Sequence, residues 1–572
     1  MHKKARLWSA YALLLLIGLS FRLFIALRLP NDEPDDGRLY AQLARNMLEQ
    51  HVYSIENQAP YNPTLIRLPG YPLFLASIYA VFGHGNNTAV RVTQAAIDTA
   101  TCVFIALVAL EWAVDEERRH RAAIVALGLA AVCPFTAIYV ATILTEVMTN
   151  FLAVGMTLAA TLAFKASTRR RAVVWWVVSG LLAGLAVLFR PDSGLFAAAI
   201  GCTLMISALR SWARLRQATV YAAIFSIAFC LVLAPWTIRN RRLFHVFQPL
   251  APAHAEMPGE FVPRGYLLWV RTWLDDERYV GPALWALDMR QIHVNEFPAK
   301  AFDSKEERDR VAALFEKYNH SDASEEQDEE QSSADDEDQD DSGDDENQEE
   351  EQPEEQPQPQ PEEADVEMTP EIDAGFAQIG QERVAHSRFR YYVRLPLKRA
   401  MTLWFDTHSQ YYPFNGELLP LEDLDYDIHQ QYWLPLFAAL TGIYSLLGVL
   451  GGVLLWLSRS ADLRRWLLLA ALLMFFRLGF FATLENPEPR YVVELFTFLI
   501  ILTGAALGST VGAALRGHPL FLARWLGRRA ATESAPTVDP KYDQGVGEGD
   551  AAGRCSEGGI AAGLGVSGDE CR

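Results

Sequence analysis

Apolar segments of spanning length, separated by polar connections, recur along most of the chain. Ten lie near residues 8–28, 92–113, 121–141, 146–164, 173–189, 192–209, 217–235, 434–457, 466–484 and 491–513. A run of about 20 apolar residues is long enough to cross the hydrocarbon core of a bilayer as a helix. The pattern therefore predicts an all-α polytopic membrane protein with about ten transmembrane helices and large extracytoplasmic loops.

Two apolar segments differ from this pattern. Residues 69–83, PGYPLFLASIYAVFG, are short and begin with prolines, which favours an interfacial or re-entrant helix over an eleventh span. The N-terminal segment has the basic start of a signal peptide, but its apolar stretch is long and lacks a small-residue cleavage site. We therefore expect a retained helix, with Arg22 near its far end reaching outward to the interface.

Basic residues collect in alternate connections. They lie in HKKAR at the N-terminus, DEERRHR (115–121), KASTRRR (165–171), RSWARLR (210–216), SRSADLRR (458–465) and the Arg-rich stretch after residue 515. Positive charge is retained on the cytoplasmic side of a membrane, so both termini are predicted to be cytoplasmic. Residues 30–90 and 236–433 then lie outside, and we expect the protein in the cytoplasmic (inner) membrane of a bacterium.

Composition divides the chain into four parts. They are an N-terminal membrane module of about seven helices (1–235) whose first outer loop is 30–90, an extracytoplasmic segment (236–433), a C-terminal membrane module of three helices (434–515), and a cytoplasmic basic stretch with a disordered tail (516–572). The hydrophobic fraction of 51% comes mainly from the two membrane modules.

An acidic run interrupts the extracytoplasmic segment. Residues 322–366 contain 23 Asp or Glu and no Lys or Arg, so removing their charge from the formal net charge of −20 leaves +3. Almost no large apolar residue lies in this run, so we expect it to be disordered. A solvated linker is favoured over sequestration of divalent metal, because no spaced ligand set is visible.

The cysteines do not suggest a disulfide framework. Four lie in apolar spans and two in the polar tail: Cys102, Cys133, Cys202, Cys230, Cys555 and Cys571. No CxxC motif or Cys/His cluster is present, so structural zinc is not expected.

The first outer loop begins with carboxylates and continues as an amphipathic pattern. The acidic residues are Asp32, Glu33, Asp35 and Asp36, and the apolar positions that follow are Leu39, Leu43, Met47 and Leu48. The spacing predicts a helix along the bilayer surface with its acidic end at the N-terminus. Helix N-termini stabilise carboxylates, so Asp35 or Asp36 could serve as a cap alone.

Six motifs, in order along the chain, resemble one enzyme superfamily. They are PDDGRLYAQLARNML (34–48), RLPGYPLFLASIYAVFG (67–83), ILTEVMTNFL (143–152), SGLLAGLAVLFRPDSGLF (179–196), LAPWTIRNRRLF (233–244) and ENPEPRYVVELF (485–496). Together they resemble bacterial membrane glycosyltransferases of the GT-C superfamily, in the branch related to dolichyl-phosphate-mannose protein mannosyltransferases and lipid A aminoarabinose transferases. The resemblance does not extend to 322–366 or to the C-terminal tail.

The resemblance implies an inverting transfer of a sugar from a polyprenyl phosphate to an acceptor hydroxyl. In related enzymes the base is an Asp of the first outer loop, four residues before a Tyr. Counting back from Tyr40 gives Asp36, and the adjacent Asp35 is the alternative. The sugar, hexosyl or pentosyl, and the acceptor, whether protein, lipid or glycan, stay open. The expected partners are the lipid-linked donor, the acceptor and membrane lipids, with no nucleic acid and no cofactor, and divalent metal dependence stays open.

Arginines at the outer interface are candidates for the donor phosphate, because a guanidinium binds phosphate oxygens bidentately. We rank Arg239 and Arg242 first, followed by Arg190 and Arg490, and an interfacial anchor is the alternative role for each. Pro235 and Pro489 favour helix breaks that would leave backbone amides for the same phosphate.

Three further residues are candidates for substrate contacts: Arg67, Glu146 and Tyr491. Arg67 precedes a Pro-Gly bend and could contact the acids of the first loop. Glu146 begins an apolar span, where stabilisation of the helix N-terminus is at least as plausible as substrate binding.

Two other functions are compatible with ten helices. A transporter or lipid flippase should show paired broken helices and ionisable groups at mid-membrane, whereas this chain carries most of its charges at the outer interface. A non-catalytic scaffold that displays the acidic run would leave the first-loop pattern unexplained. The sequence favours the glycosyltransferase.

Overall fold

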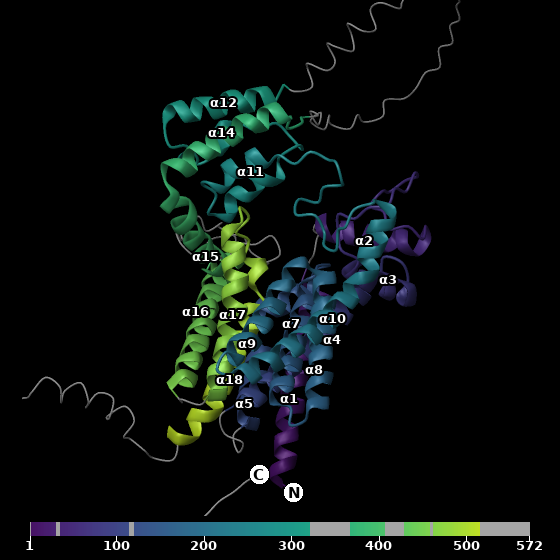
Figure 1. Cartoon of the computed structure of the whole chain (residues 1–572), viewed down its shortest axis with the longest axis vertical. Helices are drawn as coiled ribbons and strands as arrows, with labels where there is room; N and C mark the ends of the chain where they lie inside the picture. Colours follow the sequence, from purple (N-terminus) through teal and green to yellow (C-terminus); the bar gives the residue numbers. More distant parts are fainter. Residues whose placement is uncertain are drawn as a thin grey trace, which may run out of the picture. The chain divides into compact units, whose positions relative to one another are not determined.

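The computed structural model describes residues 2–29, 35–113, 119–320, 366–405, 428–457 and 461–514 (Figure 1). Across these ranges the secondary structure is helical, and no strand occurs in them. The chain divides into a compact unit, Met1–Ala513, and a C-terminal unit, Ala514–Arg572. The helices and the charged cluster described below belong to the first unit, while the predicted disordered tail lies outside the described residues.

Nine helices in the described part are long and apolar enough to span a membrane. They are α1 (His2–Arg28), α4 (Asn87–Trp112), α7 (Glu146–Lys165), α8 (Arg169–Phe189), the 3-10 turn η2 (Pro191–Ser193) continued by α9 (Gly194–Ala208), α10 (Trp212–Leu243), α16 (Ile428–Leu457), α17 (Ala461–Thr483) and α18 (Leu495–Ala514). A bent pair with an angle of 53°, α5 (Arg119–Ala131) and Pro134–Ala141, forms a tenth span if it crosses as one unit. The all-α polytopic fold is thus confirmed, and the chain is an integral membrane protein.

The bend between α5 and α6 (Pro134–Ala137) is held by an arginine from the first span. Arg22 is fully buried and pairs with Asp98 of α4, its Nε lying 2.6 Å from Oδ2. It also donates hydrogen bonds to the carbonyls of Ala130 and Ala131 at 3.1 and 3.0 Å. Pro134 has no N–H to give Ala130 its helical bond, and the Ala130 carbonyl accepts instead from the Cys133 N–H at 3.3 Å and from the guanidinium. The expectation that Arg22 reaches outward is wrong, because its partners lie inside the bundle.

Removing Arg22 alone is expected to destabilise the protein strongly. An Arg22→Met variant leaves the Asp98 carboxylate buried without its partner, and such a loss costs about 3–5 kcal/mol. The melting temperature of detergent-purified protein should therefore fall clearly below that of the parent. The double variant Arg22→Met/Asp98→Leu should recover part of this loss, and a single variant as stable as the parent would contradict the assignment.

The first outer loop forms the predicted amphipathic helix, α2 (Asp35–Glu49), followed by the short apolar helix α3 (Gly70–Phe82). The apolar face of α2 packs against protein rather than lying only on the bilayer: Leu43 is buried in a cluster with Leu65 and Trp236. At Gly70 a Cβ would lie 2.5 Å from the carbonyl oxygen of Leu188, so only glycine lets α3 approach the end of α8 this closely. α3 has 13 residues, too few for a span.

The segment between α10 and α16 has its own aromatic core. Helices α11 (Arg264–Arg271), α12 (Lys305–Tyr318) and α14 (Pro370–His386) enclose large side chains that include Trp269, Trp273, Phe297, Phe315 and Phe376. The predicted acidic run 322–366 falls between α12 and α14 and, apart from Val366, lies outside the described residues.

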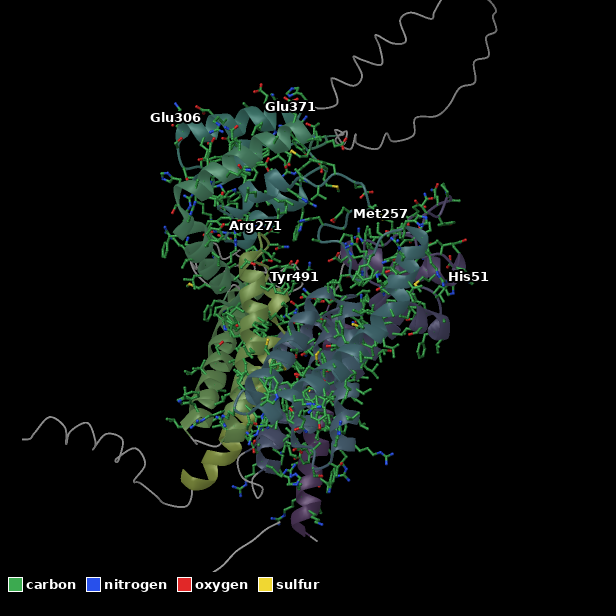
Figure 2. All side chains as sticks on the ribbon, viewed as in Figure 1. His51, Met257, Arg271, Glu306, Glu371 and Tyr491 are labelled. Atoms are coloured by element: carbon green, nitrogen blue, oxygen red, sulfur yellow. The ribbon has the colours of Figure 1, made fainter. Side chains whose placement is uncertain are left out.

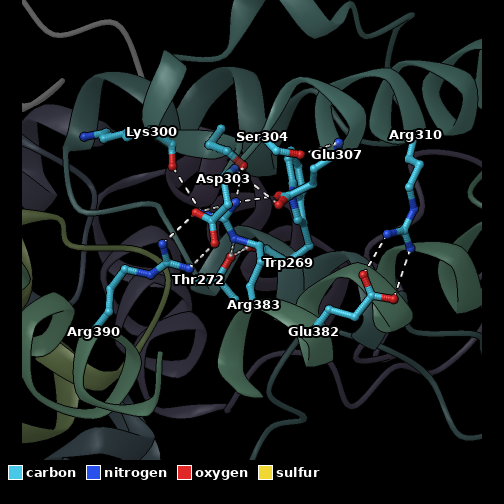
Figure 3. Close-up of polar contacts among 11 residues, drawn as sticks. Trp269, Thr272, Lys300, Asp303, Ser304, Glu307, Arg310, Glu382, Arg383 and Arg390 are labelled. Atoms are coloured by element: carbon cyan, nitrogen blue, oxygen red, sulfur yellow. Dashed lines mark hydrogen bonds and ion pairs between the residues drawn. The ribbon is translucent and has the colours of Figure 1, made fainter. Parts of the chain in front are cut away.

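One buried arginine ties this core to the loops around it (Figure 3). Arg383 donates to Thr272 Oγ1 at 2.7 Å and to the carbonyl of Ala301 at 3.0 Å. It also pairs with Asp303 and Glu307, at 3.2 and 2.5 Å. A second arginine, Arg271, joins the segment to the connection after α17 through an ion pair with Glu485 at 2.7 Å.

Candidate active site

A cluster of charged side chains brings together the two ends of the described chain. Asp36, in the first turn of α2, lies between two arginines: its Oδ1 is 3.2 Å from Arg67 Nη2 and its Oδ2 is 3.5 Å from Arg490 Nη2. Arg67 precedes α3, and Arg490 belongs to the 3-10 helix η9 (Pro489–Val492). The cluster therefore joins the first outer loop to the start of the last span.

Arg490 and Arg190 are each paired with carboxylates and share an aromatic neighbour. Arg490 Nε lies 2.6 Å from Glu488 Oε1, and Arg190 Nη1 lies 3.0 Å from Glu146 Oε1. The ring of Tyr491, labelled in Figure 2, is 5.2 Å from the Arg490 guanidinium carbon and 5.0 Å from that of Arg190. Both distances are within the range of cation–π attraction, so the ring helps to place both guanidinium groups.

The cluster continues inward through residues that our sequence predictions did not include. Arg190 Nε is 3.2 Å from Asp192 Oδ1, and Asp192 Oδ2 is 2.9 Å from Arg477 Nη1 of α17. Arg477 in turn pairs with Glu494 at 2.9 Å, and both of these side chains are fully buried. An arginine within an apolar span is a functional candidate by itself, so Arg477 carried a usable signal. The motifs that carry the resemblance also contain Asp192, Glu488 and Glu494, which the sequence predictions do not include among the site residues.

The electrostatics favour an ionised Asp36. Burial opposes its charge, but Arg490 and Arg67 outweigh that cost and hold the pKa of the carboxyl below its ordinary value. Glu488 behaves in the opposite way, because burial raises its pKa despite the neighbouring Arg490. Burial, with the charge of Asp36 as a further cause, raises the pKa of Tyr40 to about 12. At neutral pH the first loop therefore presents a carboxylate beside a neutral phenol.

Arg239 lies outside this cluster. Its Nη1 donates to the carbonyl of Thr64 at 2.8 Å and to Asn240 Oδ1 at 3.0 Å. Its guanidinium carbon lies 4.7 Å from the Trp236 ring and 5.3 Å from the Tyr53 ring. These contacts fit the interfacial anchor that was the alternative role.

A cavity of about 500 Å³ lies beside Arg239. It is lined by Met47, His51, Val52, Tyr53, Pro63, Arg239 and Leu243. The Tyr53 hydroxyl donates to the carbonyl of Arg67 at 3.1 Å, so a residue of the cavity wall contacts the backbone of the arginine that pairs with Asp36. Arg242 is exposed near the end of α10.

The predicted site residues therefore divide into two groups. Six of them come together in the charged cluster: Asp36, Arg67, Glu146, Arg190, Arg490 and Tyr491. Two others, Arg239 and Arg242, do not join the cluster. Asp35 begins α2, and its side chain lies outside the described residues.

The two prolines also differ from each other. The break expected at Pro235 is wrong, because α10 continues through it to Leu243. Neighbouring helices and local adjustments allow a membrane helix to accommodate one missing N–H. Pro489 does begin a separate short helix, η9, which carries Arg490 into the cluster.

No group of three or more His, Cys, Asp or Glu side chains placed to hold a metal ion occurs in the ranges that the structure describes. The carboxylates of the cluster are instead interleaved with guanidinium groups. The arrangement can therefore accept a proton at Asp36 and attract an anion at Arg490 and Arg190.

A known family matches part of the chain. The family model of dolichyl-phosphate-mannose-protein mannosyltransferases matches residues 63–236. The matched segment contains Arg67, Glu146 and Arg190, but neither Asp36 nor Arg490. It confirms the resemblance of the chain to GT-C membrane glycosyltransferases related to the protein mannosyltransferases. No curated protein matches the sequence.

Solved structures with distant similarity include two further glycosyltransferases. The oligosaccharyltransferase AglB from Archaeoglobus fulgidus, in complex with an inhibitory peptide and a dolichol-phosphate, aligns at 13% identity and a TM-score of 0.46, over 94% of this chain and 53% of that chain. ArnT from Cupriavidus metallidurans, bound to undecaprenyl phosphate, aligns at 14% identity and a TM-score of 0.34, over 92% of this chain and 81% of that one. The chain spans about half the length of the archaeal enzyme, and these scores are too low to establish a shared activity.

Proposed function

We propose that the protein is an inverting glycosyltransferase that moves a sugar from a polyprenyl-phosphate donor to an acceptor hydroxyl on the extracytoplasmic side of the membrane. The observation that carries the proposal is the position of Asp36 between Arg67 and Arg490. The family match over 63–236 supports it, because that family transfers a sugar from a lipid phosphate. Donor sugars can be hexosyl or pentosyl, and acceptor hydroxyls can belong to protein, lipid or glycan.

The chemistry follows from the charges in the cluster. The acceptor oxygen attacks the anomeric carbon from the face opposite the phosphate, and its proton passes to a carboxylate oxygen of Asp36. The bond from the anomeric carbon to the phosphate oxygen breaks, and the electron pair leaves with the lipid phosphate. Arg490 and Arg190 lie where they can offset the charge that develops on this leaving group.

Donor binding would also raise the pKa of Asp36, the proposed base. Without substrate, Arg490 lies beside two carboxylates, Asp36 and Glu488. A phosphate that takes hydrogen bonds from Arg490 competes with Asp36 for them. The carboxylate would then lose part of the charge that lowers its pKa and become a stronger proton acceptor.

A transfer assay tests the proposal. Purified protein in liposomes should transfer sugar from a polyprenyl-phosphate sugar, and mass spectrometry of cells with and without the protein should show the glycosylated product only when the protein is present. Liposomes in which the donor is stable and unaltered in the presence of every acceptor class would contradict the proposal.

A transporter or flippase remains the alternative function, and one observation bears on it. Arg22 and Asp98 form an ion pair inside the bundle, which is a feature expected of transporters. Arg22 also donates to the carbonyls at the α5–α6 bend, which gives the pair a structural role. The transfer assay distinguishes the two, because a flippase leaves its substrate chemically unchanged.

Topology gives a separate prediction. A reporter that is active only outside the cytoplasm should be active when fused near residue 300 and silent when fused at residue 168. The reason is that the connection at 165–171 is basic and is expected to stay inside. Paired fusions to a reporter that works only in the cytoplasm provide the control, and the reverse pattern would place Asp36 in the cytoplasm.

A further inference from the structure

Two adjoining cavities lie among the helices α7, α8, α9, α10 and α17. The first, of about 200 Å³, is lined by residues of α7 to α10 and α17, and the second, of about 270 Å³, lies between α8, α9 and α10. They share Trp176 and Leu204 as lining residues. Ala172 in the first cavity precedes Arg190 by 18 residues along α8, which corresponds to about 27 Å. The first cavity is therefore distinct from the candidate active site, and the second extends from it along α9 as far as Ala197.

The mouth of the first cavity is basic and polar. Arg214, in the first turn of α10, and Arg465 of α17 both line it. The Arg465 guanidinium carbon lies 5.2 Å from the Phe164 ring, and its Nε is buried without a hydrogen-bond acceptor among the described residues. Its ion pair with Asp462 is long, at 3.5 Å, and that carboxylate is 75% exposed. Arg465 thus keeps hydrogen-bonding capacity for an anion.

A hydroxyl completes the polar mouth. Gln217 Nε2 donates to the Tyr221 hydroxyl oxygen at 3.0 Å, and both residues line the first cavity. Because the oxygen accepts this bond, the tyrosine proton is available for an acceptor in the cavity. Two guanidinium groups and one hydroxyl donor are a donor set suited to a phosphate.

The second cavity is an apolar furrow. Its lining includes small residues on α9 and α10 and two phenylalanines: Ala197, Ala198, Gly201, Ala222, Ser226, Phe225 and Phe229. A Cβ added at Gly201 would meet no atom within 4 Å, so this side of α9 is open. By contrast, α10 lies close against α8, since a Cβ at Gly180 would be 2.4 Å from the Phe225 carbonyl oxygen. The space therefore lies between α9 and α10.

We propose that these two cavities bind an anionic glycerophospholipid. Its phosphate lies between Arg214 and Arg465, and one acyl chain lies in the furrow beside Gly201. Basic pockets between transmembrane helices on the cytoplasmic side are suited to anionic lipid headgroups. The residues that line the mouth include two arginines, Arg214 and Arg465, and no carboxylate, so it favours an anionic headgroup over a zwitterionic one. A soluble phosphate could use the mouth, but it would leave the furrow empty.

Native mass spectrometry of the full-length protein in detergent tests the proposal, with phosphatidylglycerol and phosphatidylcholine offered at equal concentration. The parent should retain phosphatidylglycerol preferentially. Arg214→Ala/Arg465→Ala should reduce that retention by about tenfold or more, because charge-assisted hydrogen bonds to the phosphate are lost. Gly201→Leu should also reduce it by filling the furrow. Arg216→Ala is the matched control: it removes a charge from the same turn but not from the cavity lining, and it should retain lipid like the parent.

Three results would overturn the proposal. They are equal retention of the two lipids by the parent, unchanged retention in either Gly201→Leu or the double Arg variant, and displacement of the lipid by millimolar inorganic phosphate in the parent. Gly201→Leu keeps every charge, so it still decides the question if the double variant does not fold. Size-exclusion chromatography and melting temperature establish that each variant is folded before its lipid is measured.

Discussion

Asp36→Asn is expected to reduce sugar transfer by about 100- to 10,000-fold, the contribution of a well-placed general base. An amide has nearly the shape of a carboxylate but cannot accept the acceptor's proton at neutral pH. The variant should still fold, because the ion pairs of Arg490 with Glu488 and of Arg190 with Glu146 do not involve Asp36. Transfer is measured with purified protein in liposomes that contain a polyprenyl-phosphate sugar.

The adjacent carboxylate provides the matched control for this experiment. Asp35→Asn removes the same charge one position earlier in α2, yet Asp36 keeps its contacts with Arg67 and Arg490. We expect a milder loss. Full activity in Asp36→Asn would remove this residue from the mechanism, and a larger loss in Asp35→Asn would transfer the role of base to Asp35.

The membrane architecture could be predicted from the sequence because the bilayer imposes a length on each apolar segment. All ten predicted segments correspond to helices or to the bent pair in the described ranges. The hydropathy pattern could not show which groups form ion pairs or hydrogen bonds with a polar side chain inside a span. Arg22 illustrates this, since its partners Asp98 and Ala130 are 76 and 108 residues away in sequence. Hydropathy alone contains no information about such pairs.

Members of the candidate cluster could be predicted where a charged residue stands at a fixed place in one of the motifs. Asp36, Arg490 and Arg190 lie in quoted motifs, and the structure brings them to one cluster. The candidate arginines differ in their surroundings. The sequence ranks Arg239 first because it follows a span at the predicted outer interface, but a guanidinium at that depth can equally pack on aromatic rings, as it does on Trp236. Which of these two environments an arginine enters depends on tertiary contacts.

Residues in the interior of the cluster were missed for a related reason. Asp192, Arg477 and Glu494 form a chain of ion pairs that links the connection after α8 with α17 and α18. Arg477 and Glu494 are single charges beside apolar residues, and Asp192 lies in the turn RPDSG (190–194). Their pairing depends on how the N- and C-terminal membrane modules pack. The chain of ion pairs fixes the position of Arg190 relative to Arg490, so these residues support the site without being predicted by its motifs.

Replacing Arg490 should weaken use of the lipid-linked donor more than replacing Arg239. Arg490→Ala removes the guanidinium beside Asp36, together with hydrogen bonds to the donor phosphate that are each worth about 1.5–3 kcal/mol. We therefore expect kcat/KM for the polyprenyl-phosphate sugar to fall by about ten- to a hundredfold per lost bond. Arg490→Lys should retain part of the activity that Arg490→Ala loses. The lysine ammonium attracts phosphate, but it cannot form the two parallel hydrogen bonds of a planar guanidinium.

Arg239→Ala is the matched comparison, since it removes an interfacial guanidinium but leaves the contacts of Asp36 in place. Both variants are assayed in liposomes with a polyprenyl-phosphate sugar or a nucleotide sugar as the sole donor. A larger loss in Arg239→Ala would locate the donor phosphate in the cavity lined by Arg239 and Tyr53 instead. Transfer from the nucleotide sugar alone would contradict a lipid-linked donor altogether, because it would require a nucleotide site that the charge cluster at Asp36 does not provide.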